Sequence, residues 1–133
     1  MVATVVTTTG AGFIIDKLDN TVGAATYFIG WGTGGSGTGG TATYADAALK
    51  ATATETQGTG SGYATTAVSQ PSADTLRFVS TITAGVAKTI EEVGVLTSSA
   101  TSGVLVIRGS HAAVTLATGD SIQYTVNLQV VPT

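Results

Sequence analysis

The sequence predicts an all-β protein, an antiparallel β-sandwich of the jelly-roll type with at most one short helix. Two observations carry this prediction. Segments rich in Val, Ile, Thr and aromatic residues recur at intervals of about ten residues, and Gly-rich turns separate them. From Ile122 to Val130 apolar and polar residues alternate without error, which is typical of a half-buried strand in an antiparallel sheet.

The length of 133 residues predicts one domain, residues 1–133. Charged residues make up 10% of the chain, against about 25% in a typical soluble domain. The surface must therefore consist largely of Thr, Ser, Ala and Gly, and such a surface is poorly protected against association. We expect copies of the chain or another protein to cover much of it.

Composition also argues against several classes of partner and site. The net charge is −3 and the five basic residues are scattered, so we expect no nucleic acid partner. The absence of cysteine excludes disulfides, thiolate metal sites and a cysteine nucleophile. The chain shows neither a signal peptide pattern nor an apolar run of about 20 residues, so we expect synthesis in the cytoplasm and no membrane association.

The N-terminal segment Val2–Thr9 is β-branched almost throughout, which favours an extended conformation. It is predicted to be an edge strand, or an extended arm within residues 1–12 that adds a strand to a neighbouring subunit. The short apolar run Phe13–Ile15 is expected to end in a turn at 16–20. The candidate interface residues of this segment are Val2, Thr4, Val5, Val6 and Thr8.

The stretch Tyr27–Gly40 runs from an apolar strand into a glycine loop. Both faces of the strand Ala24–Trp31 carry bulky residues, so it is central or meets a partner on its outer face. The loop contains a Gly-x-Gly-x-x-Gly match at 32–37 but lacks the βαβ context of dinucleotide binding. We interpret it as a flexible or close-packed contact loop, and its candidate contact residues are Trp31, Gly34 and Gly37.

The segment Tyr44–Ala51 holds good helix formers and predicts one or two helical turns, with Asp46 as a possible cap.

The remaining expected strands are Gly62–Gln70, Thr75–Thr83, Lys88–Leu96 and Gly103–Leu116. A turn at 71–74 makes the first two of these a hairpin, and a bulge is expected near Gly109 in the last. The predicted core consists of inward-facing apolar residues: Tyr27, Ile29, Trp31, Leu76, Phe78, Ile82, Val93, Val95, Leu105, Ile107, Tyr124, Val126 and Leu128.

Two adjacent carboxylates, Glu91 and Glu92, interrupt an otherwise apolar strand. One of them must point towards the core, where an unpaired carboxylate is costly. We therefore expect a salt bridge to Arg77, Lys88 or Arg108 on a neighbouring strand, and an ion pair to another subunit is the alternative.

His111 is the only histidine, so a Ser-His-Asp arrangement or a general base would have to use it. No Gly-x-Ser-x-Gly elbow lies between an apolar strand and a helix. A single histidine argues against a zinc site within one chain, although a trimer axis could bring three copies of it together. We therefore predict no enzymatic activity, no metal and no cofactor. Trp31, Tyr44 and Tyr63 could stack on sugar rings, but Trp31 alternates with core positions.

Several motifs follow one another in a familiar order. They are Trp-Gly-Thr-Gly at 31–34, Asp-Ala-Ala-Leu at 46–49, Ile-x-Glu-x-Gly at 90–94, hydrophobic-Arg at 105–108, and the alternating final strand. Over Tyr27–Val131 this order resembles small structural proteins of tailed bacteriophages, which are head decoration (cement) proteins or tail-fibre components. The resemblance implies a β-sandwich without enzymatic activity. The Gly/Thr-rich stretch Gly34–Thr43 departs from the tighter loop of that group.

We therefore expect a phage head decoration protein, a homotrimer that binds the major capsid protein on the outer surface of the shell. It would be made in the host cytoplasm and reside in the virion. A protein that binds only the assembled shell stabilises that shell by its binding free energy. The alternatives are a tail-fibre or receptor-binding component and, third, a carbohydrate-binding module.

Overall fold

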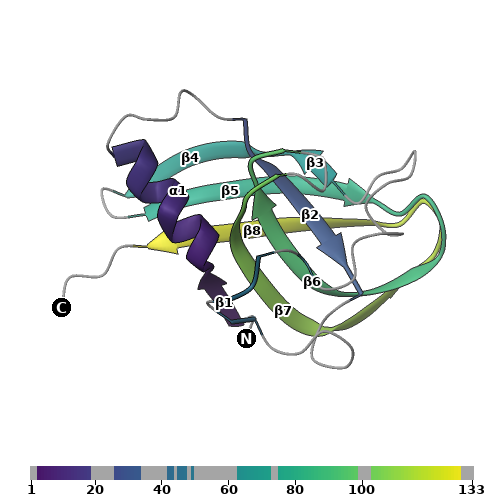
Figure 1. Cartoon of the computed structure of the whole chain (residues 1–133). Coiled ribbons are helices and arrows are strands. Elements are labelled where there is room, and N and C mark those ends of the chain that lie inside the picture. Colours follow the sequence, from purple (N-terminus) through teal and green to yellow (C-terminus); the bar gives the residue numbers. More distant parts are fainter. Residues whose placement is uncertain are drawn as a thin grey trace.

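A computed structural model of the chain describes residues 3–18, 26–33, 42–43, 45–47, 49, 63–72, 75–98 and 103–129. These residues form two antiparallel sheets and one helix (Figure 1). The predicted all-β, sandwich-like fold with one short helix is therefore confirmed.

The larger sheet has five strands and the smaller has three. In spatial order the larger sheet is β1 (Ala3–Val6), β7 (Leu105–Leu116), β6 (Lys88–Leu96), β2 (Phe28–Gly32) and β3 (Tyr63–Thr65). The smaller sheet is β4 (Ala67–Ser72), β5 (Thr75–Thr83) and β8 (Ser121–Gln129). The strands of the two sheets run in clearly different directions where the sheets face each other (Figure 1).

The chain closes one border of the sandwich by passing directly from sheet to sheet. Thr66 links β3 to β4, and its backbone N–H donates to the carbonyl of Tyr27 at 3.0 Å. Ser80 of β5 donates its hydroxyl to the carbonyl of Thr65 at 2.9 Å. These bonds hold β3 of one sheet against β5 of the other.

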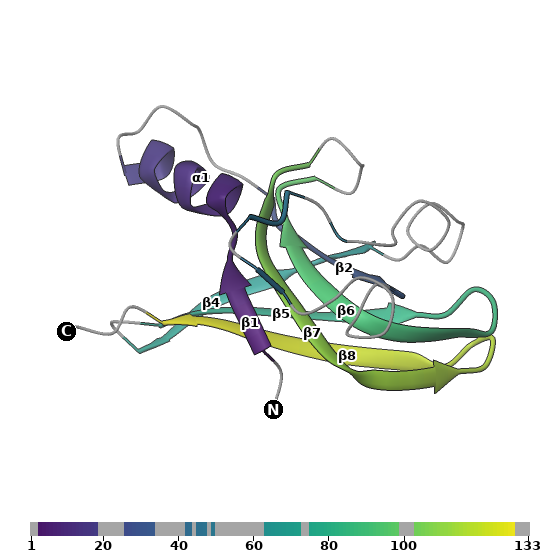
Figure 2. The same ribbon diagram turned by 60° about the horizontal axis from the view of Figure 1, so that its bottom comes forward.

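One end of the sandwich is closed in the same way by two turns that lie side by side. The β5–β6 turn and the β7–β8 turn exchange backbone hydrogen bonds, from Ala84 to the carbonyl of Asp120 and from Gly119 to the carbonyl of Ala84, both at 2.8 Å. Gly119 has φ +92°, a left-handed conformation that glycine adopts without strain. The border opposite β3 and β4 lies between the edge strands β1 and β8. There, no described segment passes from one sheet to the other (Figure 2).

The main core lies between the sheets. Most predicted core residues are confirmed as buried there: Ile29, Trp31, Phe78, Ile82, Val93, Val95, Ile107 and Val126. Four more pack against the core while half-buried, namely Tyr27, Leu76, Tyr124 and Leu128. Leu105 belongs instead to a second cluster with Leu49 and Leu96.

The strand predictions for Thr75–Thr83 and Lys88–Leu96 match β5 and β6. The expected single strand Gly62–Gln70 is wrong, because the chain changes sheets at Thr66 and forms β3 and β4 instead. β4 and β5 form the predicted hairpin, but β4 continues to Ser72, and its register against β5 shifts between Ser69 and Ser72, around Pro71.

The N-terminal segment divides into a strand and a helix. The edge-strand prediction is confirmed for Ala3–Val6, which pairs antiparallel with β7 from Ala3 opposite Ser110 to Val6 opposite Ile107. The expectation of extended chain beyond it is wrong, because Thr8–Leu18 form helix α1, which also replaces the described part of the expected turn at 16–20. Residues 3–12 are therefore not a free arm in this structure.

Thr7 explains why a helix begins here. It lies directly before α1, and its hydroxyl accepts a hydrogen bond from the N–H of Gly10 at 3.0 Å, which is an N-terminal cap. The Thr7 hydroxyl donates to the carbonyl of Leu105, and its N–H donates to the carbonyl of Val106 at 3.1 Å. The first turn of α1 is therefore fixed to β7.

The helix expected over Tyr44–Ala51 is wrong for its described residues. Ala45–Ala47 and Leu49 are not helical, while the other positions lie outside the described residues. Asp46 makes a local turn instead: its carboxylate accepts hydrogen bonds from the N–H of Thr43 at 2.8 Å and from the Thr43 hydroxyl at 2.9 Å. The same carboxylate also binds Arg108, which competes with any role as a helix cap.

Candidate interaction surface

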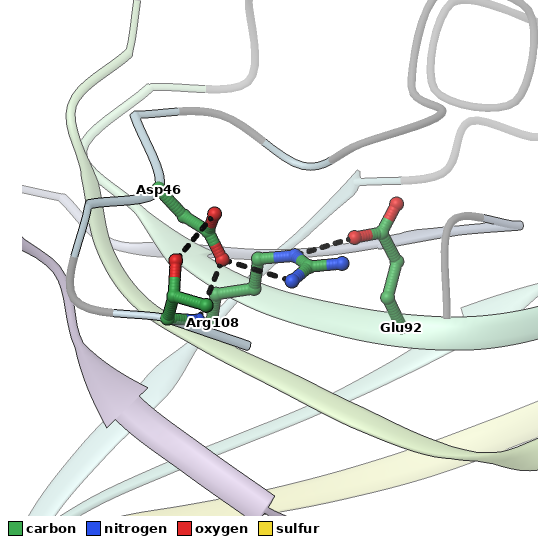
Figure 3. Close-up of polar contacts among 4 residues, drawn as sticks. Asp46, Glu92 and Arg108 are labelled. Atoms are coloured by element: carbon green, nitrogen blue, oxygen red, sulfur yellow. Dashed lines mark hydrogen bonds and ion pairs between the residues drawn. The ribbon is translucent and has the colours of Figure 1, made fainter. Parts of the chain in front are cut away.

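Arg108 lies between two carboxylates in the interior (Figure 3). Its Nε donates to Glu92 at 2.8 Å and its Nη1 donates to Asp46 at 2.9 Å. The side chains of Arg108 and Glu92 are 0% exposed and that of Asp46 is 2% exposed. The predicted salt bridge between neighbouring strands is thus confirmed, with Arg108 as the partner of Glu92. Glu92 does not point into the core between the sheets as expected, because it shares a face with Gly94 and is buried on the side of segment 42–49.

This ion cluster, Asp46, Glu92 and Arg108, joins the described part of segment 42–49 to the five-stranded sheet. Beside it, the position of a Cβ on Gly94 would lie 2.8 Å from both Leu49 and Leu105, so the same segment covers the sheet with apolar contacts. Leu49 and Leu105 complete the second cluster with Leu96. The central strands of this sheet are therefore buried on both faces, by the smaller sheet on one side and by segment 42–49 on the other.

The predicted N-terminal interface residues lie on β1 and at the start of α1. Thr4 is exposed and pairs with Gly109, and Thr8 is exposed at the first position of the helix. Val5 and Val6 are half-buried, and Val6 packs against the main core. Val2 lies outside the described residues. This segment therefore contributes to the fold as well as to the surface.

Of the predicted contact residues in the glycine loop, only Trp31 is described, and it is not at the surface. Trp31 is 0% exposed, and the Nζ of Lys88 lies 5.7 Å from the centre of its ring, within range of a cation–π interaction. The Trp31 side chain is therefore unavailable to a partner protein or a sugar in this conformation. Gly34, Gly37 and Tyr44 lie outside the described residues, and nothing is described of the Tyr63 side chain.

Two adjoining cavities lie at the open border between β1 and β8. Their volumes are about 260 and 240 Å³, and Thr4 of β1 and Asn127 of β8 line both of them. Val5 and Val6 line the second cavity, and His111 and Tyr124 line the first. The two sheets are therefore less tightly joined along this border.

His111 and Tyr124 form the main polar contact across the first cavity. The Nδ1 atom of His111 lies 2.8 Å from the carbonyl of Ala112, which can only accept, so Nδ1 donates. The Nε2 atom lies 3.1 Å from the hydroxyl oxygen of Tyr124, within hydrogen-bonding distance. Burial raises the pKa of Tyr124 above its ordinary value of 10.0, so this hydroxyl stays protonated. His111 lies within β7, and its ring contacts one backbone carbonyl and one side-chain hydroxyl.

The exposed part of the described surface is nearly free of charge. Among the residues whose exposure is described, Asp120 is the only exposed charged residue. Arg77, Lys88 and Glu91 are half-buried, and the remaining charged side chains whose exposure is described form the buried ion cluster. Thr, Ser, Ala and Gln dominate the exposed positions.

No group of metal-binding side chains, defined as three or more His, Asp or Glu close together, occurs among the described residues. In the same part of the chain no helix is long and apolar enough to cross a membrane. Comparison of the chain with protein-family models, with curated proteins and with solved structures found no match.

The sequence indicated Glu92 as one of two candidate carboxylates and Arg108 as one of three candidate partners, but not the third member of the cluster. Asp46 lies 62 positions from Arg108 in the chain, in a segment without strand periodicity. Its lone carboxylate among Ala residues resembled a helix cap. No local pattern in the sequence connects Asp46 with Arg108.

Proposed function

We propose that this chain is a head decoration protein of a tailed bacteriophage. It is made in the host cytoplasm and binds, together with further copies of itself, to the major capsid protein on the outer surface of the shell. Its function is structural: it strengthens the shell by adding contact area between shell subunits.

The observation that supports this proposal is that the exposed side chains described by the structure are nearly uncharged. A protein that works as a free monomer gains solubility from interspersed surface charges. A protein that covers a shell at high density has its surface shielded by neighbours, and a low charge reduces the repulsion between closely spaced copies. The described surface of this chain fits the second situation, with Asp120 as its one exposed charge.

The mechanism follows from mass action. A protein that binds the assembled shell but not its separated subunits stabilises the shell by the free energy of that binding. Affinity rises when the binding surface is already ordered, because less conformational entropy is lost on contact. The ordered β1 strand, which carries the candidate contact residues Thr4 and Val5 and pairs with β7, meets this condition.

The burial of Trp31 weighs against the sugar-binding alternative, which relied on exposed aromatic rings. A tail-fibre component differs from a decoration protein in where it binds and in how many copies a particle carries. Both differences can be measured.

The direct test is to add the purified protein to shells of the same phage assembled without it. We expect saturable cosedimentation with the shells and a higher temperature of shell disruption as binding saturates. An unrelated acidic β-sandwich protein of similar size serves as the control and should do neither. Failure of the protein to sediment with shells would overturn the proposal.

A further inference from the structure

The two sheets have four edge strands among the described residues, and three of them are poor sites for strand pairing. β1 has four residues and β3 has three. β4 has six, but it contains Pro71 and a register shift between Ser69 and Ser72. Short edges, proline and bulges are the usual features that prevent one sheet from adding to another.

The fourth edge strand, β8, has none of these features. It has nine residues, Ser121–Gln129, and pairs with β5 in continuous register from Thr75 opposite Gln129 to Thr83 opposite Ser121. It contains no charged residue and no proline. Its alternation is complete, with exposed polar residues on one face and Ile122, Tyr124, Val126 and Leu128 towards the core.

The free side of β8 also lies on the open border of the sandwich. No described strand pairs with it on that side, and the neighbouring edge of the other sheet is the short β1 (Figure 2). The cavities between Thr4 and Asn127 lie along this border. A long, regular edge without charge in this position is a site where another strand can add to the sheet.

We propose that β8 pairs with β8 of a second copy of this chain, antiparallel and across a two-fold axis, joining two three-stranded sheets into one six-stranded sheet. Overlap of all nine residues places the axis at Thr125, which then lies opposite Thr125 of the second copy. In this register Gln123 lies opposite Asn127, Ile122 opposite Leu128, and Tyr124 opposite Val126.

The properties of β8 favour a second copy over a different partner. Self-pairing in this register places polar residues opposite polar residues on the outer face and apolar residues opposite apolar residues on the inner face. Threonine pairs and pairs of aromatic with β-branched residues are favourable across strands. In a charged edge strand, a two-fold axis would bring the like charges of the two copies close together, and they would repel each other. β8 contains no charged residue, so this repulsion is absent.

This pairing makes a dimer, whereas the sequence led us to expect a trimer. A closed trimer would need β8 to pair with a different strand of its neighbour, since a two-fold contact joins only two copies. The other edges offer only three, four or an interrupted six residues for that purpose. The inference concerns the isolated protein and does not depend on the proposed function.

The mass of the purified protein in solution, measured by light scattering or sedimentation equilibrium, gives the first test. We expect a dimer for the unaltered chain. Thr125→Lys places two like charges at the axis on an exposed position, so it should raise the dimer dissociation constant roughly tenfold or more at low salt. Thr125→Glu should do the same, and an equal mixture of the two variants should restore dimers that contain one copy of each.

Thr81→Lys is the matched control, because Thr81 is an exposed threonine of the central strand β5, on the same sheet face as Thr125. It should leave the dimer unchanged. The chain contains no cysteine, so Thr125→Cys provides a second test. Cα atoms of directly opposed residues in an antiparallel pair lie about 4.5–5.5 Å apart, within the range of a disulfide, so mild oxidation should cross-link Thr125→Cys and not Thr81→Cys.

A monomeric or trimeric unaltered protein would overturn the inference. So would an unchanged dimer in Thr125→Lys, equal effects of Thr125→Lys and Thr81→Lys, or a dimer that Thr125→Cys does not cross-link. All these measurements use isolated protein, so their outcome is independent of the shell-binding test. A dimer that does not bind shells contradicts only the proposed function. A trimer that binds shells contradicts only the β8 pairing.

Discussion

Arg108 of β7 and Glu92 of β6 form a salt bridge of 2.8 Å in which neither side chain is exposed to solvent. Asp46 binds the other side of the guanidinium at 2.9 Å. Burying charges is costly, and their attraction repays this cost only when the geometry and the hydrogen bonds are good. The cluster therefore specifies where segment 42–49 docks more than it adds to overall stability.

Replacing Arg108 should be severely destabilising. Arg108→Met fills similar space but removes the guanidinium to which the buried carboxylates of Glu92 and Asp46 are hydrogen-bonded. We expect the free energy of unfolding, measured by urea titration, to fall by about 3–5 kcal/mol. Arg77→Met is the control and should cost less than about 1 kcal/mol, because Arg77 is half-buried and its Nε makes an exposed bond to Asn127 at 3.1 Å. Equal costs for the two variants would contradict this account.

Two glycines of α1 should respond in opposite directions to the same substitution. A Cβ on Gly10 would overlap the backbone of Val106, whereas a Cβ on Gly12 would have no atom within 4 Å. Gly10→Ala should therefore lower the free energy of unfolding by about 1–3 kcal/mol. Gly12→Ala should raise it by roughly 0.5–1 kcal/mol, because alanine favours the helix. Thermal melts of both variants check this, and stabilisation by Gly10→Ala would show that α1 does not contact β7 as described.

Stability should fall at alkaline pH. Burial raises the pKa values of Tyr27 and Tyr124 above 10.0 in the folded protein, whereas in the unfolded chain these groups titrate near 10. Above pH 10 the unfolded state therefore binds fewer protons, and the free energy of unfolding decreases as pH rises. Tyr124→Phe should make this decrease shallower in urea titrations performed between about pH 9 and 11. An identical pH slope in the variant would contradict the buried, protonated state of Tyr124.

The N-terminal strand should be required for stability. Removing residues 1–6 takes away β1, which pairs with β7, and the contact of Val6 with the core. We expect a lower midpoint of urea unfolding and faster proteolysis. Thr118→Ala, at an exposed position of the β7–β8 turn, is the control and should change little. If the truncated protein has the same urea midpoint as the full chain, residues 1–6 behave as a detachable arm instead.

Strands could be predicted from the sequence wherever one face is buried and the other is not. β5 and β8 alternate along their length, and the carboxylate pair at 91–92 pointed to a charged partner, which is Arg108. The break at Thr66 could not be predicted, because the residues on both sides favour strands and only the change of sheet separates them.

Helix α1 and segment 42–49 were missed for a different reason. Gly10, Gly12 and a run of threonines have low helix propensity, and the helix forms because Thr7 caps it and Gly10 permits close contact with Val106. Segment 42–49 is held in place by Arg108 and by Leu105, which are far away in the sequence. Both features are set by tertiary contacts that local patterns do not contain.

The measurement that tests the central claim most directly is the number of copies of this chain per purified phage particle, relative to the major capsid protein. Quantitative mass spectrometry of intact particles provides it. The proposed decoration function predicts a copy number of the same order as that of the shell protein, because the chain covers the shell lattice. A number one or two orders of magnitude lower, or absence from the particles, would contradict it.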